Sequence, residues 1–236
     1  MKNLSRHLIC TKKKCFSAET IRRLSLYLRN LRKLRENSVE IVSSNEISNF
    51  SNVSPEQFRR DLSYFGKFGK RGVGYTIDTL ISELESILGM DKKWNVALVG
   101  VGSLGSALLG FEGFSKFNLK ITCAFDVDNS KIGKDFYGAT IYSIEDLATV
   151  ITTENIEVAI IATFPDVAQA VADTLMDAGI KGILNFAPVA LQTKSDVFVF
   201  DVDMACELES LLFFVDQKRI ESELGEGRNL SVKRYR

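Results

Sequence analysis

Three glycines and one aspartate give this sequence its clearest chemical signal. Gly100, Gly102 and Gly105 follow an apolar run and open a helical one in VALVGVGSLGSALLG. In such a turn the first glycine permits tight curvature, the second lets the backbone approach a pyrophosphate, and the third lets helix and strand pack closely. Asp126 ends the next apolar run, where a carboxylate can accept hydrogen bonds from the ribose of NAD and repel the 2′-phosphate of NADP. The spacing therefore predicts a site for NADH and NAD.

Two later segments are expected to face the same crevice, because each follows directly on an apolar run. They are ATFP (162–165) and NFAPV (185–189). Small Ala187 and rigid Pro188 could wall a flat nicotinamide ring, while Asn185 offers its amide. Such segments are also typical of ordinary turns between a strand and a helix. The predicted cofactor contacts are the glycine turn, the aspartate and residues of these segments: Gly100, Val101, Gly102, Ser103, Leu104, Gly105, Asp126, Thr163, Asn185, Ala187 and Pro188.

No residue stands out as a catalyst acting on that cofactor. Hydride transfer needs a general acid or base beside the nicotinamide, and the one histidine, His7, lies near the N-terminus. No constellation of Lys, Tyr or Asp suggests itself, and no separate substrate domain remains once the first 90 residues are assigned elsewhere. We therefore predict no catalytic residues and a cofactor that is sensed rather than used.

The four cysteines show no CxxC pair, and with a single histidine they argue against a metal site. Cys10 and Cys15 lie in a lysine-rich segment. Reduced, structurally minor cysteines are the favoured interpretation, and a thiol switch is the alternative.

The second chemical signal is RRDLSYFGKFGKRGVGY (59–75). It holds five basic residues, four glycines and four aromatics, so something negatively charged should lie against it. Ser54, Pro55 and Gln57 mark the start of a helix that runs through PEQFRRDLSYF, with an N-cap and a proline in the first turn.

That helix has one apolar face and one basic face. Phe58, Leu62 and Phe65 stand at helical spacing and face the core. Three residues are thereby turned outward: Arg59, Arg60 and Ser63.

The elements around it complete a familiar pattern. From Ser17 an apolar stripe at three- and four-residue intervals predicts a first helix, and Ser43 with Glu46 forms a capping box for a second. The glycine-rich ribbon after the third helix carries Lys67, Lys70 and Arg71, and residues 77–88 form one more amphipathic helix. Three helices followed by such a ribbon indicate a winged helix-turn-helix.

The chemistry changes after a short polar joint at residues 90–94. The apolar runs VALVG, ITCAF, VAIIAT, ILNFA and VFVF alternate with helical segments. Runs that are apolar on both faces are typical of parallel strands covered by helices, so this part is predicted to be a doubly wound, Rossmann-like α/β domain. A last helix contains LLFFV (211–215), which is apolar nearly all round. This implies a partner subunit, and hence a homodimer.

Charge divides the chain in the same place. Residues 1–90 hold 16 Lys and Arg against 9 Asp and Glu, and residues 91–236 hold 14 against 21, so only the first part should meet a polyanion. The absence of a long apolar stretch or a secretory signal predicts a cytoplasmic protein with no membrane contact. The expected division is a flexible tail (1–16), a winged-helix DNA-binding domain (17–89), a Rossmann-like NAD(H)-binding domain (92–202), an exchanged dimerisation helix (203–224) and a tail (225–236).

The two halves together resemble the family of redox-sensing transcriptional repressors called Rex. The resemblance runs from about Phe16 to Leu224 and rests on SAETIRRLSLYLRNL, RRDLSYFGKFGKRGVGY, VGVGSLGSALL, FDVD, GIKGILNFAPV and VDMACELE. It implies a homodimer that binds operators of respiratory and fermentative genes when NADH is low and leaves them when NADH rises. It also implies DNA contacts from the recognition helix, its neighbours and the wing: Ser44, Arg59, Arg60, Ser63, Tyr64, Lys67, Lys70 and Arg71.

The resemblance further implies a switch of hydrogen bonds and charges. Arg23 and Asp203 match the positions of its two charged members. The third member is often a tyrosine in the family, and this chain has Phe111 there, without the hydroxyl.

The sequence is also compatible with two other functions. One is an NAD-dependent oxidoreductase with an appended basic domain, and the other is a regulator that reads coenzyme A or another nucleotide in the same crevice.

Overall fold

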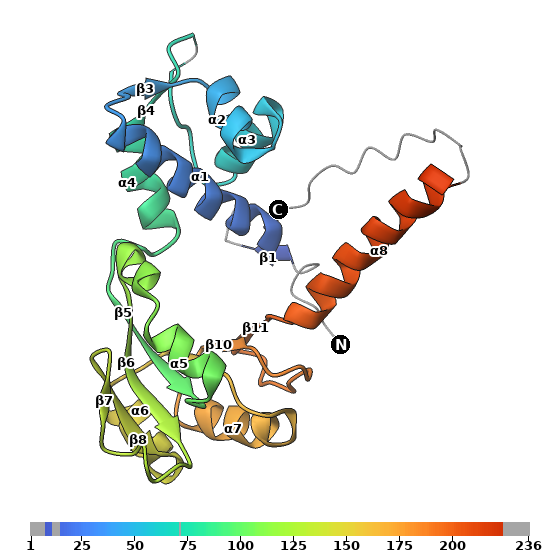
Figure 1. Cartoon of the computed structure of the whole chain (residues 1–236). Helices are drawn as coiled ribbons and strands as arrows, with labels where there is room; N and C mark the ends of the chain where they lie inside the picture. Colours follow the sequence, from blue (N-terminus) through green and yellow to red (C-terminus); the bar gives the residue numbers. More distant parts are fainter. Residues whose placement is uncertain (1–7, 11–14, 71, 224–236) are drawn as a thin grey trace. The chain divides into compact units, whose positions relative to one another are not determined.

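A computed structural model describes residues 8–10, 15–70 and 72–223 of the 236-residue chain (Figure 1). The chain divides into two compact units, Met1–Lys93 and Trp94–Arg236. Each unit has its own hydrophobic core. Within the described ranges, no helix combines the length and hydropathy that a membrane span requires.

The first unit contains the expected helices and a short ribbon. Ser43 and Glu46 form the predicted capping box, and Ser54 caps the third helix with a proline in its first turn. The elements are α1 (Ala18–Glu36), β3 (Ile41–Val42), α2 (Ser44–Ser51), α3 (Pro55–Ser63), β4 (Tyr75–Thr76) and α4 (Ile77–Ile87). Strands β3 and β4 pair antiparallel, and the glycine-rich segment predicted to be the wing lies between α3 and β4.

The core of this unit follows the predicted apolar stripes. Leu24, Leu28 and Leu31 of α1 are buried against α3 and α4. On α3, Phe58 is fully buried, and its ring meets that of Tyr27 edge to face with centroids 4.9 Å apart. Each large side chain buried in this way stabilises the fold by roughly 1.5–3 kcal/mol. Because α3 buries this face, its basic face is left exposed.

The N-terminal segment differs from the expected flexible tail. Strand β1 (Leu8–Cys10) pairs antiparallel with β2 (Cys15–Ser17), and Cys10 stands opposite Cys15 in the register. Phe16 is buried, and its ring centroid lies 4.7 Å from that of Phe65. One aromatic anchor therefore holds a segment that has no apolar periodicity of its own. Residues 1–7, 11–14 and the predicted tail 225–236 lie outside the described residues, and the thiol switch stays a prediction.

The second unit is built on a sheet whose strand order, in the described part of the chain, is β11-β10-β9-β5-β6-β8-β7. All neighbouring strands are parallel except β7 and β8. The strands are β5 (Trp94–Val99), β6 (Leu119–Asp126), β7 (Asp135–Phe136), β8 (Ala139–Ser143), β9 (Val158–Ile161), β10 (Gly182–Asn185) and β11 (Phe198–Asp201). The sequence did not predict β7 or β8, because they are short and only partly apolar.

Helices cover both faces of this sheet. α6 (Leu147–Thr153) and α7 (Pro165–Asp177) pack on one face, and α5 (Ser103–Leu109) with the 3₁₀ helix η2 (Glu112–Phe117) packs on the other. This is the doubly wound arrangement that the apolar runs indicated.

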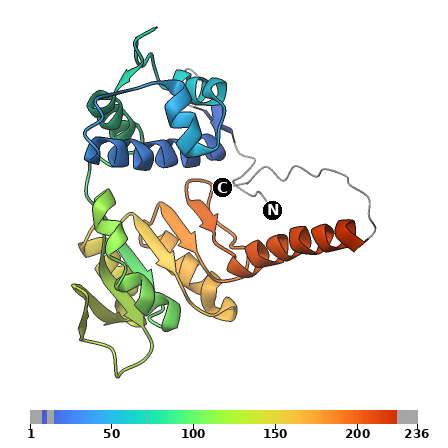
Figure 2. The same ribbon diagram turned by 45° about the horizontal axis from the view of Figure 1, so that its top comes forward.

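The last helix, α8 (Met204–Glu223), leads away from the sheet after β11 (Figure 2). The carboxylate of Asp203 caps its N-terminus by accepting hydrogen bonds from the backbone N–H groups of Ala205 (3.0 Å) and Cys206 (3.1 Å). The side chains of residues 211–215 are 43–64% exposed. An apolar helix so exposed in one chain marks an interaction surface.

Candidate functional site

A crevice of about 820 Å³ opens in the second unit at the carboxyl ends of the central strands. Strand β5 is flanked by β6 on one side and β9 on the other, so the chain reverses its winding direction here. In doubly wound folds ligands bind outside the carboxyl ends of strands at this switch point. The lining is mainly apolar, and its volume suits a small molecule or cofactor.

The three glycines at this crevice have separable roles. Gly100 has a φ of +95°, and a Cβ there would lie 2.6 Å from the carbonyl oxygen of Ala162. A Cβ at Gly105 would collide with the carbonyl oxygen of Gly100, which is the close helix–strand packing that the sequence predicted. A Cβ at Gly102 would meet nothing within 4 Å. The outer two glycines are therefore required by the fold, whereas Gly102 leaves space at the N-terminus of α5 for a ligand.

Asp126 and Lys131 supply charge at the edge of the crevice. Asp126 Oδ2 accepts a hydrogen bond from the backbone N–H of Val101 (2.8 Å), and Oδ1 accepts one from that of Asp128 (2.9 Å). The Nζ of Lys131 lies 3.4 Å from Asp126 Oδ2. Burial opposes the ionisation of Asp126, but these donors outweigh it and hold its pKa below the ordinary value. The carboxylate is therefore charged and held in one orientation.

The other predicted contacts fall into two groups. The crevice lining contains most of the predicted turn and its partners, namely Gly100, Gly102, Ser103, Leu104, Asp126 and Thr163, but neither Val101 nor Gly105. Ala187 is buried and Pro188 is exposed, and neither is among the residues that line the crevice.

Asn185 requires a correction, because it is fully buried. Its amide nitrogen donates to the carbonyl oxygens of Ala187 (3.1 Å) and Val189 (2.9 Å) and to Asp201 Oδ1 (2.9 Å), and its amide oxygen accepts from the Ala187 N–H (3.0 Å). A polar side chain buried this deeply needs internal partners. Asn185 thus shapes the loop after β10 rather than offering its amide to a ligand.

Sequence reasoning missed several lining residues, among them Lys131, Phe164 and Phe186. Phe164 and Phe186 lie within the two segments predicted to face the crevice but were not named as contacts, and Phe164 is 80% exposed. These aromatic side chains lie where a flat ring could stack. Lys131 follows Asp126 by five residues, and no sequence motif distinguishes it.

The first unit presents its own charged surface on α2 and α3. Arg59 and Arg60 are exposed, and the Nη1 of Arg59 donates to Ser44 Oγ (2.7 Å), which joins α3 to the first residue of α2. Ser63 is exposed and its Oγ donates to the carbonyl oxygen of Arg60 (2.7 Å). Tyr64 is half-buried beside the ring of Phe16. The outward face predicted for α3 is confirmed for Arg59, Arg60 and Ser63.

The wing carries the remaining basic residues. Lys67 and Lys70 are exposed, and Lys70 pairs with Gly74 through backbone hydrogen bonds of 2.9 and 3.0 Å. Gly72, between Lys70 and Gly74, has a φ of +81°, a conformation that favours glycine. Arg71, also predicted to contact DNA, lies outside the described residues.

The three residues of the predicted switch, Arg23, Phe111 and Asp203, each contact neighbours within their own unit. Both Nε and Nη2 of Arg23 donate to the carboxylate of Asp61. Asp203 caps α8, and Phe111 is 56% exposed with its ring against Phe114. Arg23 belongs to the first unit and the other two to the second, so their meeting stays a prediction.

The cysteines and possible metal ligands can be described for part of the chain. No group of three or more His, Cys, Asp or Glu side chains there could hold a metal ion. Burial raises the pKa of Cys123 to about 12, so its thiol stays protonated.

Family models match both units of the chain. One described as a putative DNA-binding protein N-terminus matches residues 16–63, and one described as a CoA binding domain matches residues 91–189.

Relatives of similar sequence cover most of the chain. The redox-sensing transcriptional repressor Rex of Syntrophobacter fumaroxidans is 44% identical over 195 residues, which are 82% of this chain and 93% of the relative. The protein of the same name from Lactobacillus acidophilus is 42% identical over 200 residues, 85% of this chain and 95% of the relative.

Solved structures also match most of this chain. The structure of RSP in complex with β-NAD⁺ and operator DNA matches with a TM-score of 0.84 and 33% identity, over 91% of this chain and 100% of that one. RSP in complex with β-NADH matches with a TM-score of 0.79 and 32% identity, over 90% of this chain and 100% of that one. RSP is described as a Rex-family repressor.

Proposed function

The chain belongs to the Rex family of redox-sensing transcriptional repressors, and from this we propose that it binds operator DNA when NADH is scarce and releases it when NADH occupies the crevice. The first unit provides the DNA-binding surface, and the second holds NADH or NAD. This activity belongs in the cytoplasm, where such a repressor meets its operators.

One observation carries the proposal: a dinucleotide crevice and a basic helix-turn-helix stand on the same chain. Gly102 has open space beside its backbone, and hydrogen bonds fix Asp126 at the edge of the crevice; we propose that the first meets the pyrophosphate and the second the ribose. A helix N-terminus favours phosphate, since its N–H groups and dipole point at the ligand. On α3, basic side chains face outward as in a recognition helix.

The crevice supports sensing rather than catalysis. In the described part of the chain, its ionisable lining groups are Asp126 and Lys131, which are paired with each other. Neither is an uncommitted acid or base for hydride chemistry. We infer that the protein is not an enzyme.

Ligand binding tests this assignment against its rivals. Titration of the purified protein with NADH, NAD, NADPH and coenzyme A should give the tightest binding for NADH. Coenzyme A is included because the second unit matches a CoA binding domain. Tighter binding of coenzyme A, or turnover of NADH with a hydride acceptor, would overturn the proposal.

Asp126→Ala should weaken NADH binding and relax the discrimination against NADPH. Hydrogen bonds to a charged group contribute about 1.5–3 kcal/mol, so the NADH affinity should fall by roughly ten- to a hundredfold. Without the carboxylate, the ammonium of Lys131 is left to attract a 2′-phosphate. Fluorescence titration with both cofactors measures this.

Asp126→Asn is the matched variant, because it keeps an acceptor for the Val101 N–H and removes the charge. It should also gain NADPH binding. If both variants bind NADH like the wild type and still exclude NADPH, another residue reads the ribose.

Two variants test the DNA-binding surface. Arg60→Ala should weaken operator binding by about 1–3 kcal/mol if Arg60 reaches a base edge. Lys70→Ala should weaken binding to all sequences more evenly. It should also lower the slope of log affinity against log salt concentration by about one, as loss of a phosphate contact does. Wild-type operator affinity in Arg60→Ala would exclude the recognition-helix assignment.

The coupling between the units is proposed to run through a homodimer joined by α8. NADH can release DNA only by favouring a dimer in which the two recognition helices no longer match the half-sites. Arg23, Phe111 and Asp203 are the proposed switch. Since Arg23 is bound to Asp61, any new partner of Arg23 would disturb α3 directly.

A further inference from the structure

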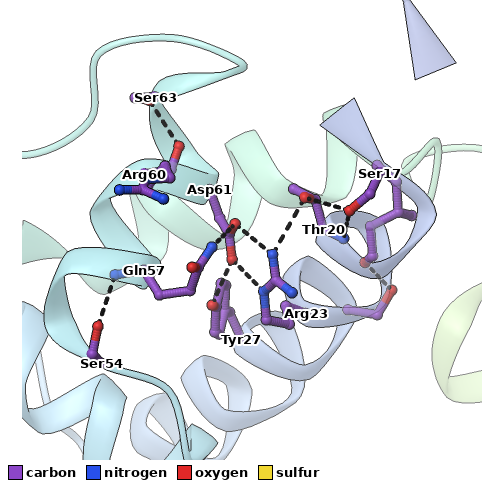
Figure 3. A network of polar contacts seen from close by, with 11 residues as sticks. Ser17, Thr20, Arg23, Tyr27, Ser54, Gln57, Arg60, Asp61 and Ser63 are labelled. Atoms are coloured by element: carbon purple, nitrogen blue, oxygen red, sulfur yellow. Dashed lines mark hydrogen bonds and ion pairs between the residues drawn. The ribbon is translucent and has the colours of Figure 1, made fainter. Parts of the chain in front are cut away.

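Asp61 is a charged residue in the core of the first unit. Its side chain is 0% exposed, although it follows directly on the exposed Arg60 of α3 (Figure 3). Aspartate is almost never fully buried unless it is paired. Neither the apolar stripe of α3 nor its basic face accounts for this residue.

Four donor hydrogen bonds converge on this carboxylate. Arg23 donates through Nε to Oδ2 (2.6 Å) and through Nη2 to Oδ1 (2.7 Å), which makes a two-pronged contact. The Tyr27 hydroxyl donates to Oδ2 (2.8 Å), and the Gln57 amide donates to Oδ1 (2.7 Å). Arg23 and Tyr27 belong to α1, so the network joins two helices (Figure 3).

The network continues to the start of α1. The Nη2 of Arg23 also donates to Thr20 Oγ1 (3.3 Å), which lies 3.3 Å from the Oγ of Ser17, the N-cap of α1. The hydrogen bonds to Asp61 raise the pKa of Arg23. Burial, and then the charge of Asp61, raise that of Tyr27, so its hydroxyl stays a donor.

Such a network fixes the relative orientation of α1 and α3 more than it stabilises the fold. A buried ion pair is often no more stabilising than apolar side chains of the same size, because both charges lose water. A guanidinium on a carboxylate fixes both the distance and the angle, since its donors form a rigid fork. Apolar contacts such as those of Phe58 are less directional. On α3, Arg59 and Ser63 stand nearly opposite Asp61, because each residue turns the helix by about 100°.

We propose that Asp61 is a positioning residue for DNA recognition. Held by Arg23 and Tyr27, it sets the rotation of α3 about its own axis. The outward residues of α3 then meet the base edges in one fixed orientation. This rests on the proposed function of α3 as the recognition helix.

The test compares Arg23→Lys and Tyr27→Phe with a control in the same unit. Arg23→Lys keeps the charge but loses the fork, and Tyr27→Phe removes one donor from the carboxylate. Glu85→Gln is the control, because Glu85 accepts from Arg32 (2.7 Å), a contact that joins α1 to α4.

The measured quantity is the ratio of affinities for two duplexes, together with the melting temperature. One duplex is the sequence that the wild-type full chain enriches most from a random library, and the other is its scrambled form. We expect this ratio to fall roughly tenfold in Arg23→Lys and Tyr27→Phe, about the discrimination that one bidentate base contact provides. In Glu85→Gln the ratio should stay at the wild-type value.

If Asp61 had only a structural role, the variants would have a lower folded fraction and would bind both duplexes more weakly by the same factor. An unchanged ratio in folded Arg23→Lys and Tyr27→Phe would therefore overturn the positioning role. If the wild type enriches no sequence from the library, the proposed function itself fails.

Discussion

Truncation of the chain after Asp201 is expected to abolish dimer formation and operator binding together, while the first unit stays folded. The truncation removes α8, whose residues 211–215 are 43–64% exposed in the single chain. Burial of each such side chain against a partner contributes roughly 1.5–3 kcal/mol, enough in sum for an obligate dimer. The first unit should be independent of this loss because, among the described residues, its core contains none of the second unit.

Operator binding should fall with the dimer because two recognition helices are needed for two half-sites. Sedimentation velocity and DNA binding measure the two effects. Leu212→Asp is a milder form of the same test, and Lys218→Ala, on the polar end of α8, is its control. A truncated protein that stays dimeric and still releases DNA on NADH addition would contradict the coupling mechanism.

Gly102→Asp should leave the fold intact and nearly eliminate NADH binding. Gly102 is the N-cap of α5, where aspartate is a favoured residue, and a Cβ there has open space. The new carboxylate would stand where a pyrophosphate is expected. At an effective dielectric constant of about 20, two like charges roughly 4 Å apart repel by about 4 kcal/mol, a loss of roughly a thousandfold in affinity.

Gly102→Asn is the matched control, since it has the same size and capping ability without the charge. It should keep the wild-type melting temperature and bind NADH better than Gly102→Asp does. Both melting curves and NADH titrations are needed. If Gly102→Asp binds NADH with an affinity within a few-fold of the wild type, the pyrophosphate does not bind at this turn.

Local signals in the sequence were sufficient where the structure depends on neighbours along the chain. The cap at Ser54, the capping box at Ser43 and the apolar stripe of α1 all form as predicted. The glycine turn was also predictable, because Gly100 and Gly105 are required by backbone contacts within one strand–turn–helix unit.

Features that depend on distant contacts were not predictable. Phe16 anchors the N-terminal hairpin through Phe65, far along the chain, so the segment had no periodic signal. Asn185 is of a residue type that often contacts ligands. Its amide instead forms hydrogen bonds with its own loop and with Asp201. The ion pair of Arg23 with Asp61 spans 38 positions and leaves no pattern in either helix.

The most direct test of redox sensing is release of DNA by the cofactor. The full-length protein is bound to the duplex that it selects from a random library and titrated separately with NADH and NAD. The predicted result is release at low concentrations of NADH, with NAD leaving the complex intact over the same range. Equal release by both cofactors, or by neither, would contradict the claim that this protein couples its DNA binding to the reduced state of NAD.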